Sequence, residues 1–296
     1  MITTVKSVEL AQEAALSLGR DSVWRLLRRH PGVMFGLAMI ALMVAAAAAA
    51  PLLAGGDPAA LNPIERLHAP SAAHWLGTDM YGRDLYTRTV YGARISLVVG
   101  LCVTLLSVAF GLAIGLVSGF VRALDAVVMR IMDGLMAIPG ILLAIAMISL
   151  AGASLATVVI AITIPEIPRV VRLVRSVVLT IREEPYVEAA ITVGTRLPWL
   201  LLRHVLPNTI APLIVQGTYV CASAIIVEAL LSFLGAGIPP EIPSWGNIMA
   251  EGRTFFQISP WIIFFPGLCL ALTVLAINVL GDGLRDTLDP RIARRM

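Results

Sequence analysis

Residues 134–181 read GLMAIPGILLAIAMISLAGASLATVVIAITIPEIPRVVRLVRSVVLTI. This mostly apolar run holds about 48 residues, whereas one membrane-crossing helix needs roughly 20. The run is therefore long enough for two crossings. The small residues Ala151-Gly152-Ala153-Ser154 predict the turn between them, because glycine and serine favour turns over continuous helix.

Charge-free windows elsewhere suit one crossing each, at residues 31–56, 95–121, 204–227 and 254–281. With the two helices of the first run, they predict an all-α membrane protein with six transmembrane helices. The composition agrees, since 58% of the residues are apolar and 14% are charged, against about 25% charged in a soluble domain. A chain this apolar could not hide its surface in one core, which excludes a soluble enzyme and a nucleic-acid binder.

The basic residues predict the orientation in the membrane. With six crossings and cytoplasmic ends, the outer segments keep only five of the 22 Lys and Arg residues, namely Arg66, Arg83, Arg88, Arg94 and Arg253. Merging the two helices of 134–181 would move the arginines of 169–203 outside, against the positive-inside rule. We therefore expect both termini in the cytoplasm.

This topology divides the chain into segments. We expect a cytoplasmic N-terminal segment at 1–31, a first transmembrane anchor helix at 32–54, an external (periplasmic) loop at 55–93, a core of five transmembrane helices at 94–284 with an inner loop at 182–206, and a cytoplasmic tail at 285–296. Within the core, Gly111, Gly115 and Gly119 recur at every fourth position. Small residues at that spacing let another helix approach closely, and we favour packing within the chain over a subunit interface.

The residues needed for catalysis or for ATP binding are missing from the sequence. Lys6 is the only lysine, so there is no phosphate-binding loop ending in Gly-Lys-Ser/Thr. None of the four histidines falls inside a predicted span, which leaves a buried serine without a base. The three cysteines lie in apolar runs without metal-ligand spacing. We therefore expect no catalytic, cofactor or metal site in this chain.

Two acidic residues lie at the edges of predicted spans. Asp133 follows Arg130 by three residues, so a helical ion pair accounts for it. Glu228 lies near the outer end of the fifth span, where we expect a structural or gating contact. No other span is expected to carry a central acid, which argues against a proton-driven secondary transporter.

Residues 235–253 form an irregular outer segment, because Pro239, Pro240 and Pro243 forbid a continuous helix. Such backbone can lie at a rim but not in lipid-exposed hydrocarbon. Trp245, in the same segment, is interpreted as an aromatic anchor at the membrane interface. This segment is a candidate external gate.

The inner loop carries the most informative pattern. It reads EAAITVG at 188–194 and, nine residues later, HVLPN at 204–208. Gly194 can end one short helix, and Pro198 permits another to start. A helix–glycine–helix unit of this kind suits docking into a groove of another protein, although an amphipathic surface loop would show the same pattern.

The inner loop resembles the cytoplasmic signature of binding-protein-dependent ABC importer permeases. Glu188, Ala189, Ala190, Gly194, Leu206 and Pro207 match it at the family spacing. His204 stands where the general signature prefers isoleucine, and His-aliphatic-Leu-Pro-Asn is characteristic of the dipeptide/oligopeptide/nickel branch. Further blocks resemble the same branch in the same order, with LGTD at 76–79, GRD at 82–84, YGARISL at 91–97, Met129-Arg130 with Asp133, LSFLG at 231–235 and NVLGDGLRD at 278–286.

The resemblance implies a type I ABC importer permease fold and a "C"-type permease subunit of the bacterial inner membrane. It implies a second, homologous permease, two cytoplasmic ATPases that bind ATP and Mg, and an external solute-binding protein, with import by alternating access. Di- or oligopeptides are the expected solutes, with nickel, glutathione or an opine as alternatives. An energy-independent channel is the alternative from another class. The residues that would couple the pore to the ATPases are Glu188, Ala189, Ala190, Gly194, His204, Leu206 and Pro207. The residues that would form the external gate or contact the binding protein are Glu228, Pro239, Pro240 and Trp245.

Overall fold

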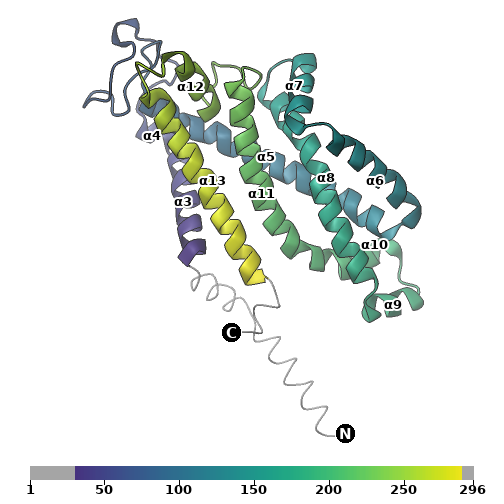
Figure 1. The fold of residues 1–296 in the computed structure, drawn as a ribbon. Helices are drawn as coiled ribbons and strands as arrows, with labels where there is room; N and C mark the ends of the chain where they lie inside the picture. Colours follow the sequence, from purple (N-terminus) through teal and green to yellow (C-terminus); the bar gives the residue numbers. More distant parts are fainter. Residues whose placement is uncertain (1–30, 289–296) are drawn as a thin grey trace.

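The computed structural model describes residues 31–288, which form helices and connecting loops without a β-strand in that range (Figure 1). The predicted N-terminal segment, except for Pro31, and residues 289–296 of the predicted tail lie outside the described residues. The helices are α3 (Pro31–Ala48), α4 (Ala50–Leu53), α5 (Leu85–Phe120), α6 (Arg122–Ala137), α7 (Gly140–Ala151), α8 (Leu155–Arg182), α9 (Pro185–Thr192), α10 (Leu197–Leu200), α11 (Leu206–Phe233), α12 (Trp245–Gly252) and α13 (Trp261–Leu288).

The long helices pack side by side, so that the connecting segments gather at two ends. α3 packs against α13, α13 against α11, and α5 lies against both α8 and α11. Figure 1 shows α12 and α7 at the upper end, and α9 and α10 at the lower end with the last turn of α13. The predicted outer segment and the predicted inner loop therefore lie at opposite ends of the bundle.

Within residues 31–288, four helical stretches are long and apolar enough to cross a membrane: Pro31–Ala48, Leu85–Phe120, Leu197–Phe233 and Trp261–Thr287. α6 and α7 together would make a fifth, bent by 86° at the break between them. Pro139 lies at this break and cannot continue the amide ladder of α6. α8 is long enough to cross a membrane but is not counted among these stretches, because its apolar part contains three charged residues, Glu166, Arg169 and Arg172. The all-helical membrane fold is confirmed, while six crossings remain a prediction.

The predicted turn at 151–154 is present. α7 ends at Ala151, Gly152 has a φ of +86°, and α8 begins at Leu155. The Ser154 hydroxyl caps α8 by accepting from the Thr157 amide at 3.1 Å. At the other end of the core, α5 begins at Leu85, inside the predicted outer loop, and is therefore longer than its charge-free window.

The glycine stripe of α5 packs against α8. A β-carbon added to each glycine would lie 2.5, 2.7 and 2.8 Å from the β-carbon of a valine, in the pairs Gly111–Val170, Gly115–Val174 and Gly119–Val178. Both series recur at every fourth residue, so each valine occupies the space above one glycine. Packing within the chain, the favoured interpretation of this stripe, is thus confirmed.

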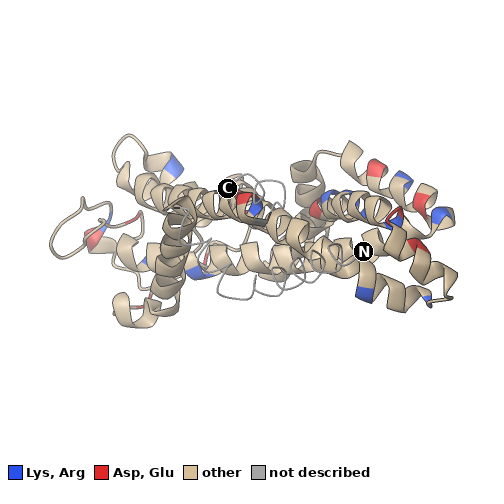
Figure 2. Cartoon of the chain, turned by 90° about the horizontal axis from the view of Figure 1, so that it is seen from below, with Lys and Arg blue, Asp and Glu red and all other residues tan. Residues whose placement is uncertain are grey.

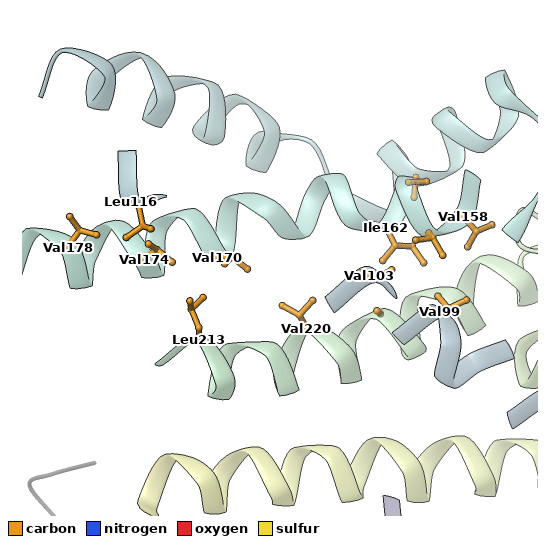
Figure 3. Packing of buried hydrophobic residues seen from close by; sticks show 14 of the residues in the cluster. Val99, Val103, Leu116, Val158, Ile162, Val170, Val174, Val178, Leu213 and Val220 are labelled. Carbon is orange, nitrogen blue, oxygen red and sulfur yellow. The ribbon is translucent and has the colours of Figure 1, made fainter. Parts of the chain in front are cut away.

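The main hydrophobic core lies between α5, α7, α8 and α11. Figure 3 shows its side chains converging from these helices, among them Val99 and Val103 of α5, Val158 and Ile162 of α8, and Leu213 and Val220 of α11. The same cluster includes buried residues from the inner loop, Val187, Leu200 and Val205. The loop is therefore part of the packed body of the protein.

Candidate functional site

The inner loop begins with α9, which ends in a glycine-dependent cap. The Thr195 amide donates to the Ala190 carbonyl at 3.0 Å, and the Gly194 amide donates to the Ile191 carbonyl at 2.9 Å. This pair of bonds reverses the chain and requires a left-handed residue, which Gly194 supplies with a φ of +84°. No atom lies within 4 Å of a β-carbon added at Gly194, so the backbone angle, not a close approach, requires glycine here.

The loop is held to the bundle by side chains that point inward. Val187, Leu200 and Val205 are completely or almost completely buried in the main core. His204 lies in a π-helical turn at Leu201–Val205 that leads directly into α11. Leu206 and Pro207 start α11, where the missing proline amide costs no helical hydrogen bond. A displacement of α9 would therefore be transmitted to α11.

The opposite face of the loop exposes large apolar side chains. Val193 is 86% exposed and Trp199 58% exposed, and Tyr186, Ile191 and Leu202 are also exposed. Several large apolar side chains exposed within one short loop are typical of a surface that binds another molecule. Ala189 is exposed and Ala190 is partly buried beside it, so only small side chains project from this part of α9.

Glu188 lies on the side of α9 that borders a polar cleft of about 470 Å³. Arg122 at the start of α6 and Arg182 and Glu183 at the end of α8 line the same cleft. The amides at the start of α9 receive no side-chain cap, so Glu188 does not cap this helix. Its exposed carboxylate is free of described side-chain hydrogen bonds and can meet a cation of another protein.

At the predicted outer end, Glu228 joins three elements. Its carboxylate is buried and accepts hydrogen bonds from Ser232 of α11 and from Ser244, both at 2.9 Å, with the Ser96 hydroxyl of α5 at 3.5 Å. Ser244 is also the N-cap of α12 and accepts from the Asn247 amide. Glu228 therefore holds the start of α12 against α5 and α11.

Trp245 is not an interfacial anchor. It is 1% exposed, and its indole N–H donates to the Thr89 carbonyl of α5 at 3.0 Å. In this conformation it has no surface to offer to lipid or to a docking protein. Pro239 is half-buried and Pro240 exposed, in a segment whose carbonyls the Asn247 side chain binds at Ile238, Pro239 and Ile242. Sequence reasoning missed Asn247, because its partners are brought together only by the fold.

A buried ionic network fixes the outer end of α5 to α12. Asp79 receives Arg83 and Arg88 at 2.6 Å each, and Arg83 also contacts Glu251 at 2.6 Å. Arg88 contacts Glu251 as well. Asp79 and Arg88 are almost fully inaccessible to water, so each charge depends on the others. Asp79 and Arg83 lie in the LGTD and GRD blocks of the sequence analysis, whereas Arg88 and Glu251 lie in no such block, and the pairing of the four residues was not predicted.

His74 bridges the outer loop to the start of α5. Its ring nitrogens lie 2.9 Å from Asp84, the N-cap of α5, and 2.9 Å from Glu65. The hydrogen bond with Asp84, supported by Glu65, raises the pKa of His74 above its usual 6.5, although partial burial opposes the shift. Within residues 31–288, no group of three His, Cys, Asp or Glu side chains is arranged to hold a metal ion.

Two interpretations of acidic residues are wrong. Asp133 pairs with Arg172 of α8 at 2.6 Å, not with Arg130 of its own helix, because α6 lies beside α8. Glu166 is a central acid that the sequence analysis did not expect: it lies inside α8, is 6% exposed and contacts Arg169 at 3.0 Å. The sequence feature that could have indicated this acid is Pro-Glu-Ile-Pro at 165–168, in the middle of the apolar run.

Comparison with known proteins places these features in a family. Residues 107–294 match the family described as binding-protein-dependent transport system inner membrane component, and residues 17–70 match the N-terminal TM domain of oligopeptide transport permease C. The chain is 56% identical to a probable peptide ABC transporter permease of Sinorhizobium fredii, over 93% of this chain and 94% of that protein. It is 43% identical to a dipeptide transport system permease of Alkalihalophilus pseudofirmus (95% and 92% covered) and 42% identical to a glutathione transport system permease of Pectobacterium atrosepticum (90% and 89%).

Proposed function

The chain belongs to the family of binding-protein-dependent transport system inner membrane components, a family of multi-pass membrane permeases, and from this premise we propose that it forms half of the pore of an ATP-driven ABC importer. The other half would be a homologous permease. Two cytoplasmic ATPases would bind ATP and Mg and hydrolyse the nucleotide, and an external solute-binding protein would deliver the solute. The lack of any lysine besides Lys6 supports the assignment of ATP binding to other subunits.

The observation that carries the proposal is the geometry of the inner loop. One face of the loop exposes apolar side chains to a partner, while Val187, Leu200 and Val205 on the opposite face are buried in the core. When ATP closes the ATPase dimer, the loops of both permeases would be drawn together. Because the loop continues into α11, that movement would reach the outer end, where Glu228 joins α11 to α12, and open the pore outward. ATP hydrolysis would reset it.

Peptides are the proposed solutes, because relatives named as peptide and dipeptide permeases cover nearly the whole chain. A relative named as a glutathione permease makes glutathione, itself a tripeptide, a specific second candidate. Nickel or an opine would require the same subunits with a different binding protein. An energy-independent channel would not need ATP, which separates it from every one of these importers.

The experiment is uptake by the reconstituted complex, with ATPase activity and subunit pull-down measured in parallel. Gly194→Val should abolish transport, because valine is strained at a φ of +84°, whereas Gly194→Asn tolerates that angle and should retain most of it. Glu188→Lys should abolish transport by reversing the charge presented to the ATPase, and Glu188→Gln should reduce it less. Permease abundance is the control for folding. Wild-type uptake in both Gly194→Val and Glu188→Lys would reduce the inner loop to an ordinary surface turn and overturn the proposal.

A further inference from the structure

The charges in the membrane-crossing part of this chain are concentrated on two adjacent helices. Viewed from below, blue and red segments gather at the right end, over α6, α8 and the neighbouring inner loop, and others lie at the left end, whereas the long helices α3, α11 and α13 are almost entirely tan (Figure 2). The sequence agrees: α3 has no charged residue, α11 has only Glu228, and those of α13 lie at its inner end. The α6–α8 side of the bundle is therefore chemically different from the rest.

Three ion pairs run along this side. Asp125 contacts Arg175, Asp133 contacts Arg172 at 2.6 Å, and Glu166 contacts Arg169 at 3.0 Å. The innermost pairs join α6 to α8, while Glu166 and Arg169 both belong to α8. At 1.5 Å per residue this last pair lies about 17 to 21 Å from the outer start of α8. It is therefore near the middle of a hydrocarbon core about 30 Å thick.

The exposure of these charges excludes lipid as their environment. The side chains of Arg169, Arg172 and Asp133 are 55%, 45% and 61% exposed. A charge at the centre of a bilayer costs at least about 2.5 to 3.5 kcal/mol, so residues of this kind face a water-filled cavity or a protein. The rest of α8 is already packed against α5, α7 and α11. α6 pairs with this face at Arg172 and Arg175, and beyond them, at Arg169, the face is left open.

One further observation favours an aqueous path over a dry protein contact, and a second shows that the backbone here is unsuited to lipid. The cores of protein interfaces are depleted of charged residues. Pro165 and Pro168 flank Glu166 and remove two amide donors from the ladder of α8. The carbonyls of Ala161 and Ile164 thus lose their partners four residues ahead, and at membrane depth such irregular backbone is tolerated where it is buried in protein or lines water.

The two charged side chains differ in their freedom. Glu166 is buried and is held from two helices, by Arg169 and by the Ser223 hydroxyl of α11 at 3.2 Å. Arg169 uses one terminal nitrogen for both Glu166 oxygens and has further N–H donors in its guanidinium. Glu166 therefore fixes the position of Arg169, and Arg169 presents a cation with donors to spare.

We propose that this face of α8 lines the translocation path, and that Arg169 is the contact in the path for a carboxylate of the passing solute, with Glu166 as its positioning residue. The inference rests on the proposed function, because an unmodified peptide carries a carboxylate at its C-terminus. A guanidinium binds a carboxylate through two parallel hydrogen bonds, which favours such solutes over cationic ones.

The test uses the complete complex in proteoliposomes, with Cys102, Cys221 and Cys269 replaced by alanine and a single cysteine introduced. Arg169→Cys should lower ATP-dependent uptake of labelled dialanine at least tenfold. A membrane-impermeant trimethylammonium thiosulfonate should label it and restore uptake at least threefold, because it returns the positive charge, whereas the sulfonate reagent should label it without restoring uptake. Leu105→Cys, whose parent side chain is exposed on apolar α5, is the matched control and should react with neither.

Glu166 is tested by kinetics. Glu166→Gln should raise the KM for uptake with little change in kcat at equal complex abundance, and Glu166→Asp should restore the KM, which a purely structural role would not predict. Two results would overturn the inference. One is that Arg169→Cys reacts with neither charged reagent while Leu105→Cys behaves as expected. The other is wild-type uptake by an Arg169→Ala complex. A wild-type complex that lacks ATP-dependent uptake of both dialanine and glutathione would count against the proposed function. The labelling of Arg169→Cys does not depend on transport, so it would still test whether this face of α8 is exposed to water.

Discussion

Replacing Gly115 by alanine should destabilise the bundle even though alanine is the better helix former. The new β-carbon would lie 2.7 Å from Cβ of Val174 and 3.0 Å from the Val171 carbonyl oxygen, so α5 and α8 must move apart or Val174 must shift. Overpacking of this kind costs about 1 to 3 kcal/mol. Helix propensity returns up to about 1 kcal/mol of it.

Gly134→Ala is the matched control, because no atom lies within 4 Å of the added carbon and only the propensity gain remains. The propensity terms cancel between the two variants. Equilibrium unfolding of the protein in mixtures of mild detergent and SDS should therefore show Gly115→Ala less stable than Gly134→Ala by about 1 to 3 kcal/mol.

A compensating change tests the same contact from the other side. Val174→Ala alone should lower the free energy of unfolding by about 2 kcal/mol, because it removes two buried methyl groups. Combined with Gly115→Ala it should cost less than the sum, with a coupling of about 0.5 to 3 kcal/mol. If Gly115→Ala matches Gly134→Ala in stability, or if the two changes add without coupling, the helices are not held at the distance described and the packing argument is refuted.

The remaining predictions concern the two ends of the protein. Because Asp84 and Glu65 raise the pKa of His74, its bridging contributes fully below the usual value of 6.5 and is lost as the pH rises through the raised value. Amide protection factors of the outer loop, which are corrected for the faster intrinsic exchange at high pH, should therefore be higher at pH 6 than at pH 8 in the wild type, and His74→Gln should remove the difference; an equal difference in both proteins would contradict it. In intact cells, a cysteine at Glu241 should react with an impermeant reagent and one at Thr195 should not, and labelling of Thr195 from outside would contradict the six-span topology.

The features that could be predicted from the sequence are those that depend on neighbours along one helix. The turn after Ala151 follows from small residues between two apolar runs, and the packing role of Gly115 follows from spacing that repeats once per turn. The φ of Gly194 belongs to this group, since a helix that ends at a glycine commonly uses its left-handed conformation.

The features that could not be predicted depend on residues far apart in the chain. Asp133 was assigned to Arg130 because only helical neighbours can be read from spacing, whereas its partner Arg172 lies 39 residues away. Trp245 was placed at the lipid interface by its residue type, but its acceptor on α5 is 156 residues away. Glu166 interrupts the charge-free windows from which spans are predicted, so those windows end before it and do not show that it lies inside α8.

The buried network of the outer end has a consequence for how the protein is made. Arg88 is separated from Glu251 by 163 residues. At 5 to 20 residues per second, the ribosome needs about 8 to 33 s to synthesise the second residue after the first. During this interval Asp79 faces two guanidinium groups without the second carboxylate, so burial of the complete network has to wait for Glu251. Closure of the outer end is thus a late event of biogenesis, timed by the arrival of α12.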